Sequence, residues 1–134
     1  MNTVNLTPLH KACMDENLKK IKQLLANNVD INLVDMHGYT PLCFSSYHGR
    51  IKSMELLLEH DADVNKCNQY GETPLYVACQ NAYTSIVRLL IAYGADLNYF
   101  TKNHWTPLHV ASSNGFLLIA QILMDSGAVQ YKML

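Results

Sequence analysis

Dense clusters of apolar residues recur along the chain at helical spacing. They lie within residues 18–25, 51–58, 86–91 and 118–124. Each fits a 3.6-residue period and is long enough to form a helix. A sparser group of apolar and small residues precedes each cluster, as at residues 9–13. The pattern therefore predicts pairs of helices, in which the second helix carries the denser apolar stripe.

The triplet Thr-Pro-Leu precedes every predicted pair and recurs at intervals of 33 residues. Its threonines are Thr7, Thr40, Thr73 and Thr106. A threonine hydroxyl caps a helix by accepting a hydrogen bond from a backbone N–H, and proline is tolerated at the first helical position. We expect each threonine to begin a first, short helix. A fixed period of this length indicates one supersecondary unit that is copied and stacked.

Turn-forming residues follow the second predicted helix of the first three units. The sequence Asp-x-Asn occurs at residues 30–32, 63–65 and 96–98, with glycine beyond it at Gly38 and Gly71. Such a stretch favours a turn that projects outward before the next Thr-Pro. The unit is therefore predicted to be turn, helix, loop, helix.

Taken together, these motifs resemble the ankyrin repeat. The pattern Thr-Pro-Leu-His-x-Ala, glycine, Leu-Leu and Gly-Ala-Asp-Leu-Asn has near-ideal matches at residues 94–98 and 106–109. The resemblance implies an all-α ankyrin-repeat solenoid of helix-turn-helix units with projecting β-hairpin-like turns. We expect residues 1–134 to form a single ankyrin repeat domain, with repeats at 7–39, 40–72, 73–105 and 106–134.

Several residues depart from the family pattern. Glu16 and Ala82 stand where glycine usually breaks the two helices, and each would cost up to about 1 kcal/mol in a left-handed conformation. Cys43 and Tyr76 replace the usual histidine of Thr-Pro-Leu-His. His104 replaces the turn glycine of the third repeat, which predicts a distorted turn there.

Composition and charge exclude several classes of function. The chain has 134 residues, 49% of them hydrophobic, which suffices for one continuous core. Its net charge of −1 gives no electrostatic basis for binding nucleic acid, and no apolar run is long enough to span a membrane. The four cysteines lack the spacing of a metal site, and residues 1–4 lack the charged and apolar pattern of a secretory signal. We expect reduced thiols, no metal, no cofactor and a cytoplasmic or nuclear location.

No arrangement of residues indicates catalysis. The sequence contains no glycine-rich phosphate loop and no His-Glu-x-x-His or Gly-x-Ser-x-Gly motif. The resemblance implies that His10 and His109 form hydrogen bonds that link adjacent turns. The chain is therefore predicted not to be an enzyme.

Three asparagines are candidates for modification. Asn32, Asn65 and Asn98 each lie eight residues after a leucine, behind an aspartate and an aliphatic residue. This context is similar to that of asparagines hydroxylated in many ankyrin proteins. The alternative is that they simply hydrogen-bond within the turns.

The resemblance also implies a concave face, built from the turns and the first helices, for binding a protein partner. The positions expected on it are Met36, His37, Tyr39, Tyr47, His48, Gln69, Tyr70, Glu72, Gln80, Asn81, Lys102, Asn103, Trp105, Ser113 and Asn114. Tyr39, Tyr70 and Trp105 are predicted to form an exposed, nearly uncharged aromatic strip, while Phe100 fits either the face or packing along its turn. We expect a non-catalytic protein–protein interaction module: an adaptor, an inhibitor or a substrate-recognition unit.

An alternative role follows from the last repeat. Residues 116–119 are Phe-Leu-Leu-Ile, and terminal repeats of a solenoid normally need a polar outer face. Exposed apolar residues there would favour self-association, or a structural segment of a larger ankyrin-containing protein.

Overall fold

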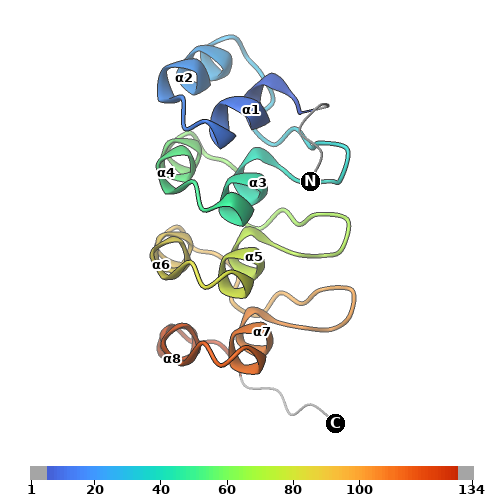
Figure 1. Ribbon diagram of the computed structural model, residues 1–134, viewed down its shortest axis with the longest axis vertical. Helices are drawn as coiled ribbons and strands as arrows, with labels where there is room; N and C mark the ends of the chain where they lie inside the picture. The colour runs from blue at the N-terminus through green and yellow to red at the C-terminus, as the bar shows by residue number, and fades with distance from the viewer. Residues whose placement is uncertain (1–5, 130–134) are drawn as a thin grey trace.

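The computed structural model describes residues 6–129 as a stack of four helix pairs (Figure 1). None of these residues lies in a β-strand, and no helix among them is long and apolar enough to cross a membrane. Each predicted repeat range contains one pair. The pairs are α1 (Pro8–Met14) with α2 (Leu18–Ala26), α3 (Pro41–His48) with α4 (Ile51–Glu59), α5 (Pro74–Gln80) with α6 (Thr84–Ala92), and α7 (Pro107–Ser113) with α8 (Leu117–Asp125).

The first helix of every pair begins as the sequence predicts. Thr7, Thr40, Thr73 and Thr106 are the N-caps, and proline follows each of them at the first helical position. Each hydroxyl accepts a hydrogen bond from the backbone N–H three residues later, at 3.1–3.2 Å. These bonds satisfy donors that have no partner within the helix.

The break between the two helices of each pair uses a left-handed residue. Gly49 and Gly115 both have φ of 73°, whereas Glu16 and Ala82 reach 48° and 59° with a side chain present. At Gly49 a side chain would also meet the ring of Tyr83, with 3.1 Å between Cβ and Cζ. The left-handed conformation is therefore required in all four repeats, and two of them adopt it without glycine.

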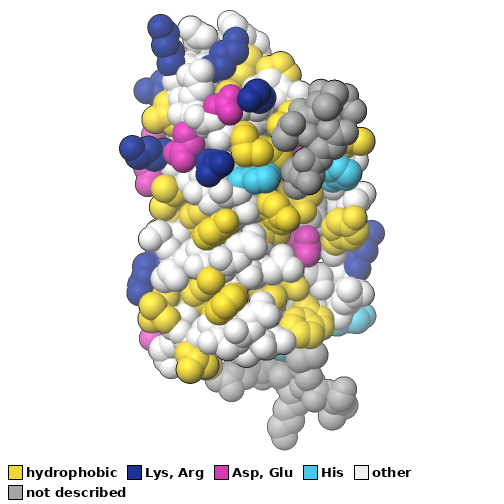
Figure 2. Space-filling view, in the orientation of Figure 1, with side chains coloured by type: hydrophobic (Ala, Val, Ile, Leu, Met, Phe, Trp, Pro, Cys, Tyr) yellow, Lys and Arg dark blue, Asp and Glu magenta, His cyan; other side chains and the backbone are white. Residues whose placement is uncertain are grey.

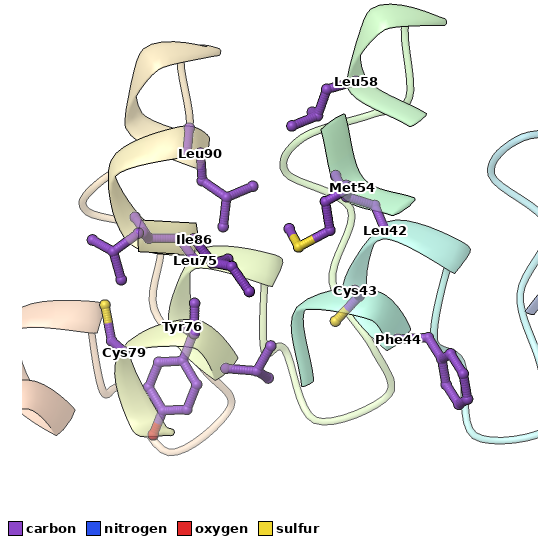
Figure 3. Close-up of a cluster of buried hydrophobic side chains, with 14 of the residues drawn as sticks. Leu42, Cys43, Phe44, Met54, Leu58, Leu75, Tyr76, Cys79, Ile86 and Leu90 are labelled. Carbon is purple, nitrogen blue, oxygen red and sulfur yellow. The ribbon is translucent and has the colours of Figure 1, made fainter. Parts of the chain in front are cut away.

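The hydrophobic core runs continuously between neighbouring pairs. Leu42 and Met54 of the second pair approach Leu75, Ile86 and Leu90 of the third, and all five side chains are buried (Figure 3). No pair could cover this apolar surface alone, so the fold is stabilised by stacking.

The turns between the pairs project to one side of the stack (Figure 1). The first two close similarly, with Asp35 N donating to Tyr39 O and Asn68 N donating to Glu72 O, both at 3.0 Å. In the third turn, Thr101 N donates to the carbonyl of residue 105 at 2.8 Å. The turns therefore share one hydrogen-bond pattern.

The predicted distortion of the third turn is wrong, because His104 itself adopts the left-handed conformation, with φ of 64°. The corresponding glycines, Gly38 and Gly71, lie under the following turn, where a Cβ would come within 3.0 Å of the backbone nitrogens of Gln69 and Lys102. The third turn is the last of the described turns, and His104 is exposed. Its side chain therefore has room that the two glycines lack.

A ladder of side-chain hydrogen bonds joins successive repeats. Asn32 and Asn65 accept bonds from the backbone N–H groups of Asp63 and Asp96, at 2.9 and 2.8 Å. Asn98 accepts in the same way from Val129 N at 2.8 Å, although the fourth repeat lacks Asp-x-Asn. These bonds fix the turns in register.

Candidate functional site

The first helices of the last three pairs carry no charged side chain, whereas α1 contains Lys11. Helices α3, α5 and α7 contain no Lys, Arg, Asp or Glu. In Figure 2 charged side chains are concentrated over the upper part of the stack, near α2 and α4, and are sparse towards α7 and α8.

The predicted aromatic strip is only partly exposed. Tyr70 has 55% of its surface accessible, whereas Trp105 is half-buried and packs against the core. The prediction for Tyr39 is wrong, since only 6% of this residue is accessible. Its ring meets that of Tyr47 edge-on, with 6.0 Å between the centroids. Tyr47 is 38% accessible and lies outermost in this pair.

The other predicted residues of the face divide into two groups. His37, His48 and Glu72 are half-buried. The remainder are exposed: Met36, Gln69, Gln80, Asn81, Lys102, Asn103, Ser113 and Asn114. Phe100 is also exposed, and its ring lies 5.7 Å from that of His104.

His48 is held by its neighbours. Its ring lies 4.6 Å from that of Phe44 and 5.1 Å from that of Tyr47. Burial, with a smaller contribution from the Arg50 guanidinium, lowers the pKa of His48. The imidazole therefore tends to remain neutral, as it would in a packing role.

Four of the predicted residues meet at one pocket. Tyr70, Glu72, Asn103 and Trp105 line a hollow of about 240 Å³ together with Tyr76 and Thr101. Sequence reasoning did not place the last two on the face. The sequence contained one sign that Tyr76 is unusual: it replaces the histidine of Thr-Pro-Leu-His in α5.

Asn68 organises the Glu72 side of this pocket. Its side-chain oxygen accepts bonds from the backbone N–H groups of Tyr70 and Glu72, at 2.9 and 3.0 Å. Its amide nitrogen donates to a carboxylate oxygen of Glu72 at 2.9 Å. The opposite wall belongs to the third turn, which is held against the second by a backbone hydrogen bond from Lys102 N to Tyr70 O, at 3.1 Å. The pocket is therefore pre-formed.

His10 performs the linking role that the resemblance implies. Its Nε2 donates to the carbonyl of Tyr39 at 2.7 Å, so Nδ1 accepts from the Thr7 hydroxyl. The residue is completely buried, and burial lowers its pKa, although the Tyr39 carbonyl and Asp35 act in the opposite direction. At the corresponding position of the second repeat, the Cys43 thiol donates to the carbonyl of Glu72 at 3.7 Å.

His109 contributes to the capping box of α7, where its Nδ1 accepts from Thr106 N at 3.1 Å. This bond lies within a single repeat. The role of His109 in linking adjacent turns stays a prediction.

The described residues contain no cluster of His, Cys, Asp and Glu that could hold a metal ion. All four cysteines are free, and Cys13, Cys43 and Cys79 are buried. Burial raises the pKa of Cys13 and Cys79 to about 12, which makes these thiols poor nucleophiles. Cys67 is half-buried, with its sulfur 3.5 Å from the hydroxyl of Tyr99.

Comparison with known proteins agrees with this architecture. A family model described as "Ankyrin repeats (3 copies)" matches residues 1–68 and 61–132. No curated protein matches the chain. Because the family model spans most of the sequence and the helices stack as repeated pairs, the chain belongs to the ankyrin repeat family.

Proposed function

We propose that the chain is a non-catalytic adaptor, inhibitor or substrate-recognition unit that binds a protein partner on its concave face. Ankyrin repeats are generally protein–protein interaction modules, so the general role follows from the family. The observation that carries the proposal is the combination of exposed Tyr47 and Tyr70 with the first helices α3, α5 and α7, which lack charged residues. Neither residue belongs to the buried core, although the ring of Tyr47 packs on Tyr39.

The physical basis is a pre-organised surface. Because hydrogen bonds and a shared core hold the turns, association need not order a flexible segment. Tyrosine is among the residues that dominate interface energetics, at about 2 kcal/mol or more on truncation. A partner that buries about 800 Å² on this face would form an interface of standard size.

The test is capture of partners from cells that express the protein, using wild-type chain and the double variant Tyr47→Ala/Tyr70→Ala. Tyr93→Ala is the matched control, since Tyr93 is 45% exposed at the end of α6, away from the first helices. We expect a protein that wild type and Tyr93→Ala retain and that the double variant loses, with circular dichroism unchanged. Equal capture by all three proteins would refute this face.

The alternative of a structural or self-associating segment is favoured by the start of α8. Leu117 and Leu118 are 76% and 60% exposed. Lysine or serine occupies the position of Leu118 in the other repeats, at Lys19, Lys52 and Ser85. Sedimentation of wild type and Leu118→Lys tests it: a concentration-dependent dimer that the variant abolishes supports self-association, and a wild-type monomer at high concentration contradicts it.

Two further proposals concern modification and location. Hydroxylation of Asn32, Asn65 and Asn98 stays a prediction, and in the structure each side chain accepts a hydrogen bond from the next repeat. Mass spectrometry of native protein tests it through the added mass of one oxygen. A cytoplasmic or nuclear location is proposed with it, and imaging of the tagged protein tests that location.

A further inference from the structure

We propose that the pocket between α5 and the last two described turns binds a basic side chain, arginine or lysine, from the partner protein. This inference rests on the proposed protein-binding function and specifies its chemistry. The pocket is lined by Tyr70, Glu72, Tyr76, Thr101, Asn103 and Trp105.

The aromatic lining provides the first argument. Tyr70, Tyr76 and Trp105 come from three different segments and converge on a single hollow. The faces of tyrosine and tryptophan rings carry partial negative charge and attract cations within about 6 Å. Tyr76 is 8% exposed and Trp105 is half-buried, so their positions are fixed by packing. Two fixed rings and the exposed ring of Tyr70 around one space favour a flat or extended cationic group.

The charge of the lining provides the second argument. Glu72 is the only lining residue that carries a full charge, and it forms no ion pair within residues 6–129. Asn68 fixes its carboxylate through a 2.9 Å bond. The pKa of Tyr76 is raised by burial and then by Glu72, which agrees with a negative pocket. A carboxylate in this setting pairs with a guanidinium or ammonium group through charge-assisted hydrogen bonds.

The size of the pocket and the cost of burial exclude other occupants. A volume of about 240 Å³ lies below the range typical of small-molecule sites, so the pocket suits one side chain. An apolar side chain would remove water from Glu72 without supplying a partner, and such burial is costly. An acidic side chain would be repelled. A basic side chain satisfies both the carboxylate and the rings.

The test uses nuclear magnetic resonance of labelled protein, with the indole N–H of Trp105 as reporter. The chain contains one tryptophan, so this signal needs no further assignment. The probes are the capped tripeptides Gly-Arg-Gly and Gly-Lys-Gly, and the neutral isostere with citrulline in place of arginine. We expect a saturable shift with at least one basic peptide and affinity about tenfold weaker for the citrulline peptide. No shift with either basic peptide, or equal affinity for the arginine and citrulline peptides, would overturn the proposal.

Glu72→Gln provides the decisive variant, because glutamine retains the oxygen that accepts the bond from Asn68. We expect it to abolish the preference for basic peptides over citrulline. Glu59→Gln at the exposed end of α4 is the matched control and should retain the preference. If the preference survives Glu72→Gln, the proposed pocket is wrong. Should the probes fail while Tyr47→Ala/Tyr70→Ala still loses a captured partner, the proposed function stands without this pocket.

Discussion

The clearest test of the stacking mechanism is the pH dependence contributed by His10. This residue connects α1 to the end of the first turn, directly before α3, by donating from Nε2 to the carbonyl of Tyr39. Its complete burial lowers its pKa in the folded protein below the ordinary value of 6.5. The chain itself offers the matched substitution, because Cys43 occupies the same position one repeat later and also donates to a carbonyl. The perturbation is therefore His10→Cys.

The sign of the effect follows from proton binding. Between the lowered pKa of the folded state and 6.5, the unfolded chain binds more protons than the folded one, so stability falls as pH falls. The contribution is complete above the unfolded pKa and decreases below it. For one histidine that stays neutral when folded, lowering the pH from about 7.5 to about 5.5 reduces the free energy of unfolding by up to about 1.4 kcal/mol.

His10→Cys should itself destabilise the protein at pH near 7.5, by about 1–3 kcal/mol, because a smaller group replaces a buried, hydrogen-bonded ring. The variant lacks the titrating imidazole. Its stability deficit relative to wild type should therefore shrink as the pH is lowered, by up to about 1.4 kcal/mol. The assay is urea denaturation of both proteins at a series of pH values, followed by circular dichroism. His48 titrates in both proteins, so its effect cancels in the difference.

A deficit that stays constant with pH, or that grows as pH falls, would refute this reasoning. A constant deficit would mean that His10 binds its proton as readily in the folded chain as in the unfolded one, and a growing deficit would mean that the folded chain binds it more readily. The imidazole would then be accessible to water, and the bond that connects α1 to the turn before α3 would not exist in solution.

Three further predictions concern the backbone, the ladder and the thiols. Asn65→Ala should lower the free energy of unfolding by about 1 kcal/mol in urea denaturation, since the N–H of Asp96 loses its acceptor. Ala82→Gly should raise the thermal midpoint by relieving a left-handed alanine, whereas Gly49→Ala should lower it; the opposite order would contradict the strain argument. In the native protein a thiol reagent should modify Cys67 first, and urea should expose all four cysteines; rapid native labelling of the others would contradict their burial.

The elements that the sequence predicted are those set by local chemistry. A threonine followed by proline specifies the start of a helix wherever it occurs, and all four caps form. The left-handed conformation of Glu16 and Ala82 could also be predicted from the sequence, because copies of one unit repeat its backbone conformation. Aligning the four copies of the unit is therefore sufficient to obtain the helices, their order and the stacking.

Side chains that depend on a neighbouring repeat were harder to predict. Tyr39 resembles an exposed turn residue in the sequence, but the ring of Tyr47 and the adjacent core bury it. The third turn keeps the regular conformation because its His104 is exposed. Nothing in the described part of the chain packs over His104, whereas the following turns pack over Gly38 and Gly71. Neither outcome follows from a single repeat, since each depends on what the next repeat places beside it.

The pocket lies where one repeat departs from a hydrogen-bond pattern that the two earlier repeats follow. In the first two repeats, the residue after Thr-Pro-Leu, His10 or Cys43, donates to the carbonyl that precedes the next Thr-Pro. In the third repeat that residue is Tyr76, and within residues 6–129 its side chain makes no such bond to Trp105; it lines the pocket instead. Departures from a rule that the rest of a fold obeys are expected at functional sites. The pocket thus combines a first helix without the usual bond to the following turn, a carboxylate held by Asn68 and converging rings, and this coincidence is the reason why we propose recognition there.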